Sequence, residues 1–571
     1  MVSASAEIVI VFNGEVYNFR EIATELVQRG HVLVSQSDTE VVLAAYREWG
    51  PRCVDRFIGM FAIAIWDGPQ RCLRMFRDRL GVKPLYYTWD GQVLTFASEL
   101  KALRALPHWN ATPDPTAVGE FLQYGYIGAP RSIYGGVHKL LPGHWLHLGE
   151  SGEPELQSYW SLTAVLAKGK LEISAGDAEA ELESLLESAF RYRMVADVPV
   201  GLFLSGGVDS SLVAAILKKI GYSPVAFTIG FESAVHDETA AAAGVAAALG
   251  LEHRPTTITR TEAASILDQW ATLYDEPFGD HSGVPTYLVA KLAREQVKVA
   301  VSADGGDELF CGYSGYPLIA ERMARFDRWA KYSGGVGRIM EYAAAAAPGP
   351  SFGLGARLQA ATGHGLMADR LHKMSGYLSA ETPLQAIRPF KSFFQPLEIS
   401  ALLGTHYRDP RATAIEWPGA PMEQLMAMDL NEYLPDDVLT KVDRATMAVG
   451  LEGREPLIDH RIVEMAFRLP LSMKHGPLGN KQILRSILYR HIPRALVDRP
   501  KQGFSAPIAD WMRDIIATGR MRTALDALSE KMPMLDKKLL REYQDVSKAN
   551  AQGLNRLWLL YVLGNWAKRW A

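Results

Sequence analysis

Apolar and polar positions divide the chain into two parts with different periods. Up to about residue 165, short apolar runs are separated by turn residues, among them VIVFNG, MFAIAIWD, CLRMFRD, PLYYTW and QVLTFAS. This spacing predicts antiparallel sheets with short helices. Farther along, apolar strands alternate with helical stretches, as in DVPVGLFLSGGVDSSLVAAILKKIG and VPTYLVAKLAREQVKVAVSADGGDELF. That alternation predicts a doubly wound parallel sheet, which binds its ligands at the carboxyl ends of the strands.

A polar stretch separates the two parts. It runs from HLGESGEPELQSYW to KGKLEISAGDAEAE and is interpreted as a linker. The predicted domains are therefore residues 1–165 and 178–571. Beyond residue 320 the pattern is mostly helical, and YAAAAAPGPSFGLGA is expected to be a loop or an inserted lobe.

Composition narrows the class of protein. Of 571 residues, 48% are apolar and 22% charged, and the net charge of -4 offers no basic field for a nucleic acid. No apolar run reaches the roughly 20 residues that span a bilayer, and no basic segment precedes the first one. The three cysteines, Cys53, Cys72 and Cys311, lack the spacing of a metal or redox site. We therefore expect a cytoplasmic protein without a nucleic-acid or membrane partner.

The segment SGGVDSS joins a predicted strand to a predicted helix. Gly206 and Gly207 let the backbone approach an anion, and the start of the helix offers N–H groups. Ser205 and Ser210 add hydroxyl donors. No Gly-Lys-Ser/Thr follows, so this is not the loop of the common nucleoside triphosphatases. The pattern predicts a phosphate-binding loop of another kind.

Acidic residues follow two of the predicted strands. Asp209 lies in the phosphate loop, and Asp307 lies in SADGGDE. An acid repels phosphate unless a cation intervenes, and Mg²⁺ prefers one or two carboxylates together with phosphate oxygens. If both turns open on one edge of the sheet, the two residues share Mg²⁺ on one pyrophosphate. The alternatives are helix capping by these acids and a calcium loop, for which the ligand pattern is incomplete.

Four segments carry a resemblance to a known family. SGGVDSS, SADGGDELF, YLPDDVLTKVDRATMAVGLEGREPLIDH and RPKQGFSAPIADWM are together similar to the glutamine-dependent asparagine synthetases, and the similarity covers essentially the whole chain. It implies a partial N-terminal-nucleophile glutaminase, a β-sandwich with helices, followed by an ATP-pyrophosphatase domain of the adenine nucleotide α-hydrolase type. Such enzymes use ATP to adenylate the carboxylate of aspartate. Ammonia made from glutamine then passes through a tunnel and displaces AMP. The resemblance leaves a homodimer open as the assembly.

The same motifs imply roles for single residues. The pyrophosphate loop would be Ser205, Gly206, Gly207, Asp209 and Ser210, with Mg²⁺ on Asp209 and Asp307. The rest of the ATP pocket would be Leu204, Ile229, Ser302 and Ala303. Asp304 takes the place of an acid associated with forming the acyl-adenylate, and Lys501 resembles the lysine that meets the α-phosphate. Taken alone, Lys501 is an ordinary exposed lysine.

The pair Asn13-Gly14 has two interpretations. Between β-rich runs it is a signal for a hairpin turn. The resemblance instead matches FNGEVYN to the glutaminase segment that forms the oxyanion hole, with Glu15 beside it in the glutamine site. It matches SDTE to the segment whose acid, Asp38, holds the amino group of glutamine. RDRLGVKPLYY and FASELKAL complete that pattern.

The nucleophile of this family is missing from the start of the sequence. It is a cysteine at the first position of the mature chain, whereas this chain begins Met1-Val2. We therefore expect a chain that starts at an internal methionine, lacks the first strands of the glutaminase domain and uses free ammonia. The residues Ile8 to Phe12 should then have unpaired edges, and the N-terminal domain should be loose and prone to aggregation.

Several alternatives stay open. The acid could be another carboxylate, such as a sugar uronate of a surface polysaccharide or an intermediate of secondary metabolism. A catalytically idle homologue is a further alternative, although a binding subunit has no need of the reactive-site charges. Three residues depart from the family pattern without an assigned role: Cys311 replaces a glycine, and Gly453 and Glu455 stand where alanine and valine are frequent.

Overall fold

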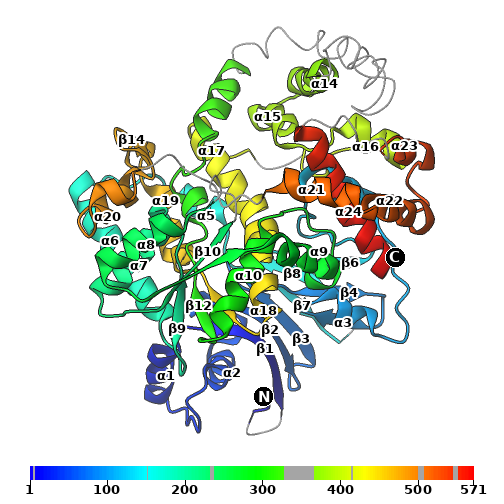
Figure 1. Ribbon diagram of the computed structural model, residues 1–571. Helices are drawn as coiled ribbons and strands as arrows, with labels where there is room; N and C mark the ends of the chain where they lie inside the picture. Colours follow the sequence, from blue (N-terminus) through cyan, green and yellow to red (C-terminus); the bar gives the residue numbers. More distant parts are fainter. Residues whose placement is uncertain are drawn as a thin grey trace.

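The computed structural model describes residues 1–3, 7–150, 152–231, 237–326, 366–412, 416–498, 507–543 and 551–571. In these ranges the blue N-terminal strands lie against a larger α/β part, and helices near the C-terminus cover one side of both (Figure 1). Two expectations lie outside the described residues: the loop or lobe at YAAAAAPGPSFGLGA and the position of Lys501.

Two antiparallel sheets build the N-terminal part, which confirms the predicted architecture. The larger has the order β1-β2-β3-β7-β8, namely Ile8–Val16, Gly59–Asp67, Cys72–Arg77, His144–Leu148 and Glu155–Ser158. The smaller has the order β5-β4-β6, namely Leu94–Ala97, Tyr86–Trp89 and Val137–Lys139. Each of the five quoted apolar runs contributes a strand. The predicted linker is wrong in part, because β8 pairs with β7 and the helix α5 (Leu162–Ala167) follows it.

Strand β2 explains why the sheets and helices stack in layers. Ile63 and Ile65 of β2 share a core with Ile22 of α1 (Phe19–Gln28) and Val42 of α2 (Asp38–Trp49). The alternate residues of β2, Ala62 among them, pack with the smaller sheet. A strand with apolar side chains on both faces is buried on both. A 3₁₀ turn (Gly50–Arg56), α3 (Leu100–Arg104) and α4 (Pro115–Tyr124) complete this part.

The larger part contains a five-stranded sheet in which every pair is parallel, as predicted. Its order is β11-β10-β9-β12-β13, namely His253–Ile258, Ala226–Phe231, Val200–Phe203, Val299–Val301 and Glu452–Arg454. The helices that accompany it are α6 (Ala175–Arg193), α7 (Val208–Lys219), α8 (Thr239–Leu249), α9 (Arg260–Tyr274), α10 (Gly283–Arg294) and α11 (Gly306–Leu309).

The chain beyond α11 is mostly helical, again as predicted. A long helix runs through α17 (Pro421–Met428), a π-helical stretch (Asp429–Val438) and α18 (Leu439–Met447) before it reaches β13. Helix α19 (His460–Arg468), the two-residue strands β14 (His475–Gly476) and β15 (Gly479–Asn480) and α20 (Gln482–Leu488) follow. Short 3₁₀ turns lie at Pro456–Ile458, Leu471–Met473 and Arg494–Leu496.

Further helices lie in the C-terminal part of the chain. They are α14 (Leu366–Ser379), α15 (Pro383–Lys391), α16 (Pro396–Leu403), α21 (Ile508–Ala517), α22 (Arg520–Lys531), α23 (Lys537–Glu542) and α24 (Ala551–Trp570). Helix α24 contacts α22, α9 and α4, so one apolar core includes helices from both parts.

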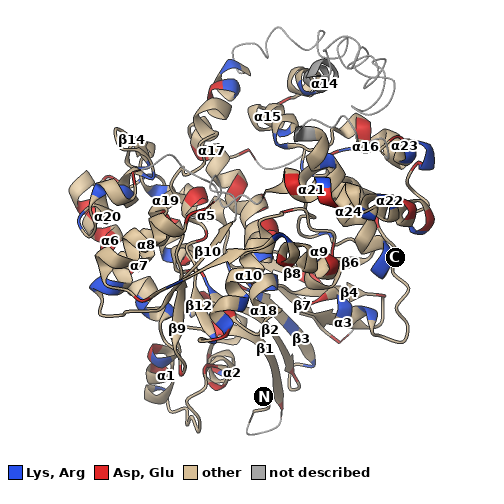
Figure 2. Ribbon diagram, in the orientation of Figure 1, with Lys and Arg blue, Asp and Glu red and all other residues tan. Residues whose placement is uncertain are grey.

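Charge and hydropathy of the folded chain agree with the composition. Basic and acidic residues are interspersed over the elements seen in Figure 2, rather than gathered on one side. Among the described residues, no helix has both the length and the apolar character that crossing a bilayer requires.

Candidate functional site

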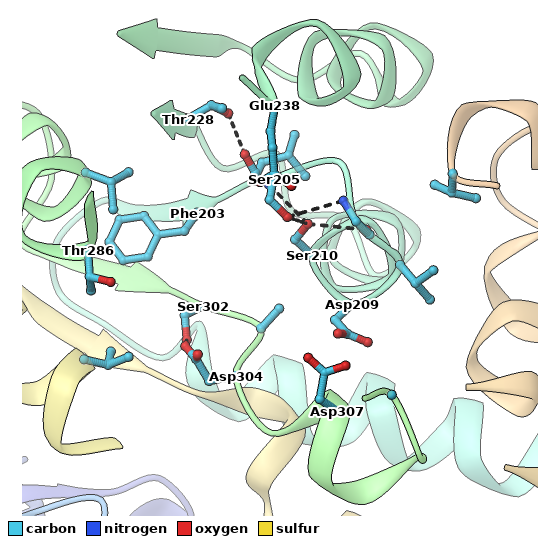
Figure 3. Close-up of a pocket in the computed structure, with 18 of the residues that line it drawn as sticks. Phe203, Ser205, Asp209, Ser210, Thr228, Glu238, Thr286, Ser302, Asp304 and Asp307 are labelled. Atoms are coloured by element: carbon cyan, nitrogen blue, oxygen red, sulfur yellow. Dashed lines mark hydrogen bonds between the residues drawn. The ribbon is translucent and has the colours of Figure 1, made fainter. Parts of the chain in front are cut away.

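A cavity of about 490 Å³ opens at the carboxyl ends of β9, β10 and β12 (Figure 3). Its wall contains nearly all of the residues expected for an ATP pocket: Leu204, Ser205, Gly207, Asp209, Ser210, Ile229, Ser302, Ala303, Asp304 and Asp307. Gly206 is not part of the wall. This is the sheet edge at which doubly wound folds bind ligands.

The phosphate loop is shaped by Gly206 and by hydrogen bonds within the loop. Gly206 has φ +70°, and a Cβ there would lie 2.7 Å from the backbone carbon of Ala241. The hydroxyls of Ser205 and Ser210 are 3.0 Å apart, and the N–H of Gly207 donates to Ser205 Oγ at 3.3 Å. The loop leads directly into α7, so the N-terminus of this helix opens on the cavity.

The two acidic turns lie at the same edge, as the sequence hypothesis required. Asp209 belongs to the first turn of α7 and Asp307 to α11. A Cβ at Gly306 would come within 2.5 Å of Asp209 Cγ, so the turns are in contact. Figure 3 shows the two carboxylates turned toward each other.

A lysine that the sequence reasoning missed lies between these acids. Lys481 Nζ forms ion pairs with Asp209 and with Asp307 Oδ1, the latter at 2.5 Å. Burial alone would lower the pKa of Lys481, but the two carboxylates outweigh it and hold this pKa above its usual range. The residue lies between β15 and α20 with φ +59°. The only signal for it is the turn GNK, which resembles many surface hairpins.

A second missed lysine lines the cavity near Asp304. Ser302 donates a hydrogen bond from Oγ to Asp304 Oδ2 at 2.7 Å. Lys441 of α18 donates to Asp280 Oδ2 and to Ser282 Oγ, each at 3.0 Å. Burial alone would lower the pKa of Lys441, but the charges of Asp280 and then Asp304 outweigh this effect and raise the pKa above its usual range. The cavity therefore combines a phosphate loop with a fixed positive charge beside Asp304.

The acidic pair suits a magnesium ion that is shared with phosphates. Among the described residues, no group of three or more His, Cys, Asp and Glu comes together to hold a metal by itself. Mg²⁺ is usually bound by one or two carboxylates together with the phosphates of a substrate. Asp209 and Asp307 supply such a donor set, and a cation, Lys481, already lies between them.

The hairpin interpretation of Asn13-Gly14 is wrong. Both residues lie inside β1, where Asn13 pairs with Ala62 and Gly14 with Phe61 of β2. Gly14 has φ +137°, and a Cβ there would lie 2.0 Å from the carbonyl oxygen of Met60. The Asn-Gly pair therefore serves a close approach of two backbones rather than a chain reversal.

The residues expected to hold glutamine meet at the end of β1. Asn13 Nδ2 donates to Ser98 Oγ at 3.2 Å, and the N–H of Val16 donates to Asp38 Oδ2 at 3.1 Å. Burial, followed by the charge of Glu452, raises the pKa of Glu15 to about 7, and burial also raises the pKa of Asp38.

Strand β1 has partners along both edges. Its full length pairs with β2, while Val2 bridges Val9 and the N-terminal amine of Met1 donates to Ile10 O at 2.9 Å. The expectation that Ile8 to Phe12 have unpaired edges is therefore wrong where residues 1–3 lie alongside. Looseness and aggregation of the domain stay predictions.

All three cysteines are buried and free of disulfides, as ordinary packing residues are. Burial raises the pKa of the Cys311 thiol to about 11. Cys311 has φ +56°, which explains why a glycine is frequent at this position. Its sulfur lies 3.2 Å from that of Met426.

Fold and site define a nucleotide-binding α/β domain joined to an antiparallel β domain. The profile of the glutamine amidotransferase domain matches residues 1–160, and that of asparagine synthase matches residues 181–568. The second match spans more than half of the chain, and the chain belongs to the asparagine synthase family. It is accordingly a carbon–nitrogen ligase with a glutamine amidotransferase domain, and ATP use is expected throughout its family.

Named relatives cover most of the chain. Glutamine-hydrolyzing asparagine synthetase 1 of Bacillus subtilis (strain 168) is 29% identical over 88% of this chain and 77% of its own length. A putative glutamine-hydrolyzing asparagine synthetase of Mycobacterium tuberculosis (strain ATCC 25618 / H37Rv) is 31% identical over 88% and 76%. A relative with a different name, amidase chyE of Penicillium rubens, is 26% identical over 88% and 77%.

Proposed function

We propose that the protein uses ATP to adenylate the side-chain carboxylate of aspartate, and that ammonia then displaces AMP to give asparagine. The observation that carries the proposal is the meeting of Asp209, Asp307 and Lys481 beside the phosphate loop, within the cavity at the sheet edge. The names of the relatives support aspartate as the acid and glutamine or ammonia as the nitrogen source.

The loop and Lys481 bind the part of ATP that leaves. Attack of a carboxylate on the α-phosphorus brings two anions together and concentrates charge on the departing pyrophosphate. The hydroxyls of Ser205 and Ser210, together with the N-terminus of α7, hold the phosphate oxygens. Lys481 contributes positive charge at the same place. Asp209 and Asp307 would hold Mg²⁺, which when bound neutralises pyrophosphate charge.

The neighbourhood of Asp304 would take the acid. Lys441 is fixed by Asp280 and Ser282, so its position is set before a substrate enters. Aspartate carries a second carboxylate, and Lys441 supplies the positive charge that such a group needs. Lys501 remains our proposed partner of the α-phosphate, on the motif RPKQGF alone.

We propose free ammonia as the nitrogen source of this chain. None of its three cysteines is exposed, so none is placed to attack glutamine. Glutamine would still bind at Asn13, Gly14, Glu15 and Asp38. Glutamate release from glutamine by the 571-residue chain would contradict this part of the proposal. We also expect the protein to work in the cytoplasm, where ATP is made, and leave a homodimer as a hypothesis.

One experiment tests the reaction. The protein is incubated with ATP, Mg²⁺, an ammonium salt and single candidate acids, and AMP and the amide are measured. Asparagine together with an equal amount of AMP supports the proposal. A second candidate is amidation of a different carboxylate, because a few pocket contacts decide which acid binds, so a sugar uronate and other acids are included. AMP formation with another acid and none with aspartate would favour that candidate. No AMP with any acid would favour an idle homologue.

A further inference from the structure

A buried carboxylate that the proposed reaction leaves unused lies beside the nucleotide cavity. Glu455 follows β13 and is 5% exposed. At the end of the neighbouring strand, the N–H of Ser302 donates to the carbonyl oxygen of Arg454 at 3.0 Å. Glu455 therefore leaves the sheet next to the segment that carries Asp304, and Asp304 is near enough to influence its ionisation.

Glu455 lines a second cavity, which lies between the two parts of the molecule. We call it the interdomain cavity, and it is lined by Tyr17, Gly59, Met60, Asp78, Arg79, Leu80, Val82, Arg193, Glu455, Ile458 and His460. Its volume of about 20 Å³ is enough for one water-sized molecule, and ammonia has that size. Met60 of its wall pairs with Glu15 in the β1–β2 ladder, so the cavity adjoins the strands of the expected glutamine site.

Gly453 makes room for this carboxylate. A Cβ at position 453 would lie 3.3 Å from Glu455 Oε1 and 3.3 Å from Thr446 Oγ1, which is tighter than ordinary contact. Gly453 and Glu455, the two residues of EGREP that depart from the family pattern, are therefore related: the small residue leaves space for the carboxylate of the other.

The surroundings leave the carboxylate of Glu455 without a hydrogen-bond donor in the part of the chain that the structure describes. The charges that act on it most strongly are those of Asp304, Lys83, Asp443 and Arg193. The cavity wall also holds the titratable groups Tyr17, Asp78, Arg79 and His460, and Arg79 donates to the carbonyl oxygens of Val54, Asp55 and Phe57. Lys83 donates to Asp443 at 2.9 Å, and Arg193 is paired with an aspartate of its own. Burial, and then the charge of Asp304, raises the pKa of Glu455 to about 8. Such a group is a stronger base than an ordinary carboxylate.

We propose that Glu455 binds ammonium at the interdomain cavity and removes one of its protons, so that neutral ammonia reaches the acyl-adenylate. The inference rests on the proposed function, in which ammonia is the nucleophile. Ammonium has no lone pair and cannot attack a carbonyl carbon. Its N–H groups match the donor-free oxygens of Glu455, and the charge it carries is opposite to that of the carboxylate.

The proton and electron balance is simple. Ammonium and the Glu455 carboxylate give ammonia and the carboxylic acid. The nitrogen lone pair then forms the bond to the acyl carbon, while the bond from that carbon to the AMP oxygen breaks and its electron pair stays on AMP. The nitrogen loses one proton to water as the amide forms, and Glu455 returns its own proton to water.

Hydroxylamine provides the discriminating test, because near neutral pH it is largely uncharged and does not need to lose a proton before attack. Glu455→Gln is assayed in three ways: aspartate-dependent exchange of pyrophosphate into ATP without any nitrogen source, amide formation from ammonium, and hydroxamate formation from hydroxylamine. We expect pyrophosphate exchange and hydroxamate formation to stay near the wild-type rates. Amide formation from subsaturating ammonium should fall about 100-fold.

Two further variants control for structure. Glu464→Gln makes the same change at a half-buried carboxylate of α19 that lines neither cavity, and all three rates should be unaffected. The double variant Gly453→Ala with Glu455→Val fills the space with the residues frequent in the family, and it should show the same selective loss as Glu455→Gln.

The pH profile gives an independent readout. Without Glu455 the rate depends on free ammonia in solution, so in Glu455→Gln it should keep rising by about tenfold per pH unit just above pH 8, where the wild-type rate levels off because Glu455 is ionised. Equal losses in all three assays, or an unchanged ammonium rate, would overturn the inference. Absence of pyrophosphate exchange in the wild-type protein would instead overturn the proposed function.

Discussion

Replacement of Lys481 by alanine is the sharpest test of the nucleotide site. The side chain is 7% exposed and lies between two carboxylates that are 17% and 23% exposed. Lys481→Ala leaves Asp209 and Asp307 facing each other without a cation. The variant should therefore be destabilised when no ligand is bound, and it should also lose positive charge where pyrophosphate departs.

The size of both effects can be worked from the geometry. Opposite charges about 4 Å apart attract by about 4 kcal/mol at an effective dielectric constant of about 20, before the cost of burying the lysine is subtracted. Removing one partner of a buried pair typically costs about 3–5 kcal/mol. Because water still reaches both carboxylates, we expect the lower end, about 3 kcal/mol. Loss of one charge that stabilises the transition state should slow AMP formation about 100-fold or more.

Lys219 offers a matched control. It also pairs with two carboxylates, Glu183 at 2.8 Å and Glu187 at 2.7 Å, but it is 41% exposed and remote from the cavity. Lys219→Ala should change the free energy of unfolding by less than about 1 kcal/mol and leave AMP formation intact. Urea unfolding and initial rates at saturating ATP measure both quantities. Wild-type AMP formation by Lys481→Ala would refute the reasoning.

Three other changes have defined outcomes. Asp209→Asn or Asp307→Asn should abolish AMP formation while circular dichroism stays that of the wild type, and normal turnover would contradict the assignment. Gly14→Ala should cost about 3 kcal/mol in urea unfolding because the new Cβ meets a backbone oxygen, whereas Gly30→Ala, with positive φ but open space, should cost less. Burial raises the pKa of Glu455 from about 4.5 in the unfolded chain to about 8 in the folded protein. The contribution of this residue to the free energy of unfolding is therefore fully present below about pH 4.5 and is lost as pH rises through about 8. Glu455→Gln should therefore be more stable than the wild type at about pH 8.5, with a gap that closes at about pH 4.5; a gap of constant size would contradict this.

Regular elements could be predicted because their signals are local. The apolar run of β2 predicts a strand from its own residues, and SGGVDSS predicts a strand-to-helix turn with a phosphate loop. The position of Asp209 opposite Asp307 followed from a general rule, that parallel strands end at one edge.

Local sequence patterns did not predict the sites that depend on tertiary contacts. Asn13-Gly14 has the composition of a hairpin turn, yet continued pairing with β2 keeps it inside a strand. Lys481 lies in a hairpin with two-residue strands, too short for any periodic pattern, and its partner Asp209 is far away in the sequence. Glu455 stands out only against the family pattern, and what it faces depends on β12 and on the N-terminal part.

Strand β13 leads from the expected glutamine site to the interdomain cavity. Arg454 is 2% exposed; it donates to the carbonyl oxygens of Arg193 and Val195, and its guanidinium lies 3.6 Å from Glu15 on β1. The next residue, Glu455, faces the interdomain cavity. Two neighbouring residues, the last of β13 and the one that follows it, thus contact the expected glutamine site and line the interdomain cavity. Because a strand this short and this buried moves as a unit, a shift that alters one contact alters the other. The expected glutamine site and the interdomain cavity therefore share one buried element of the fold.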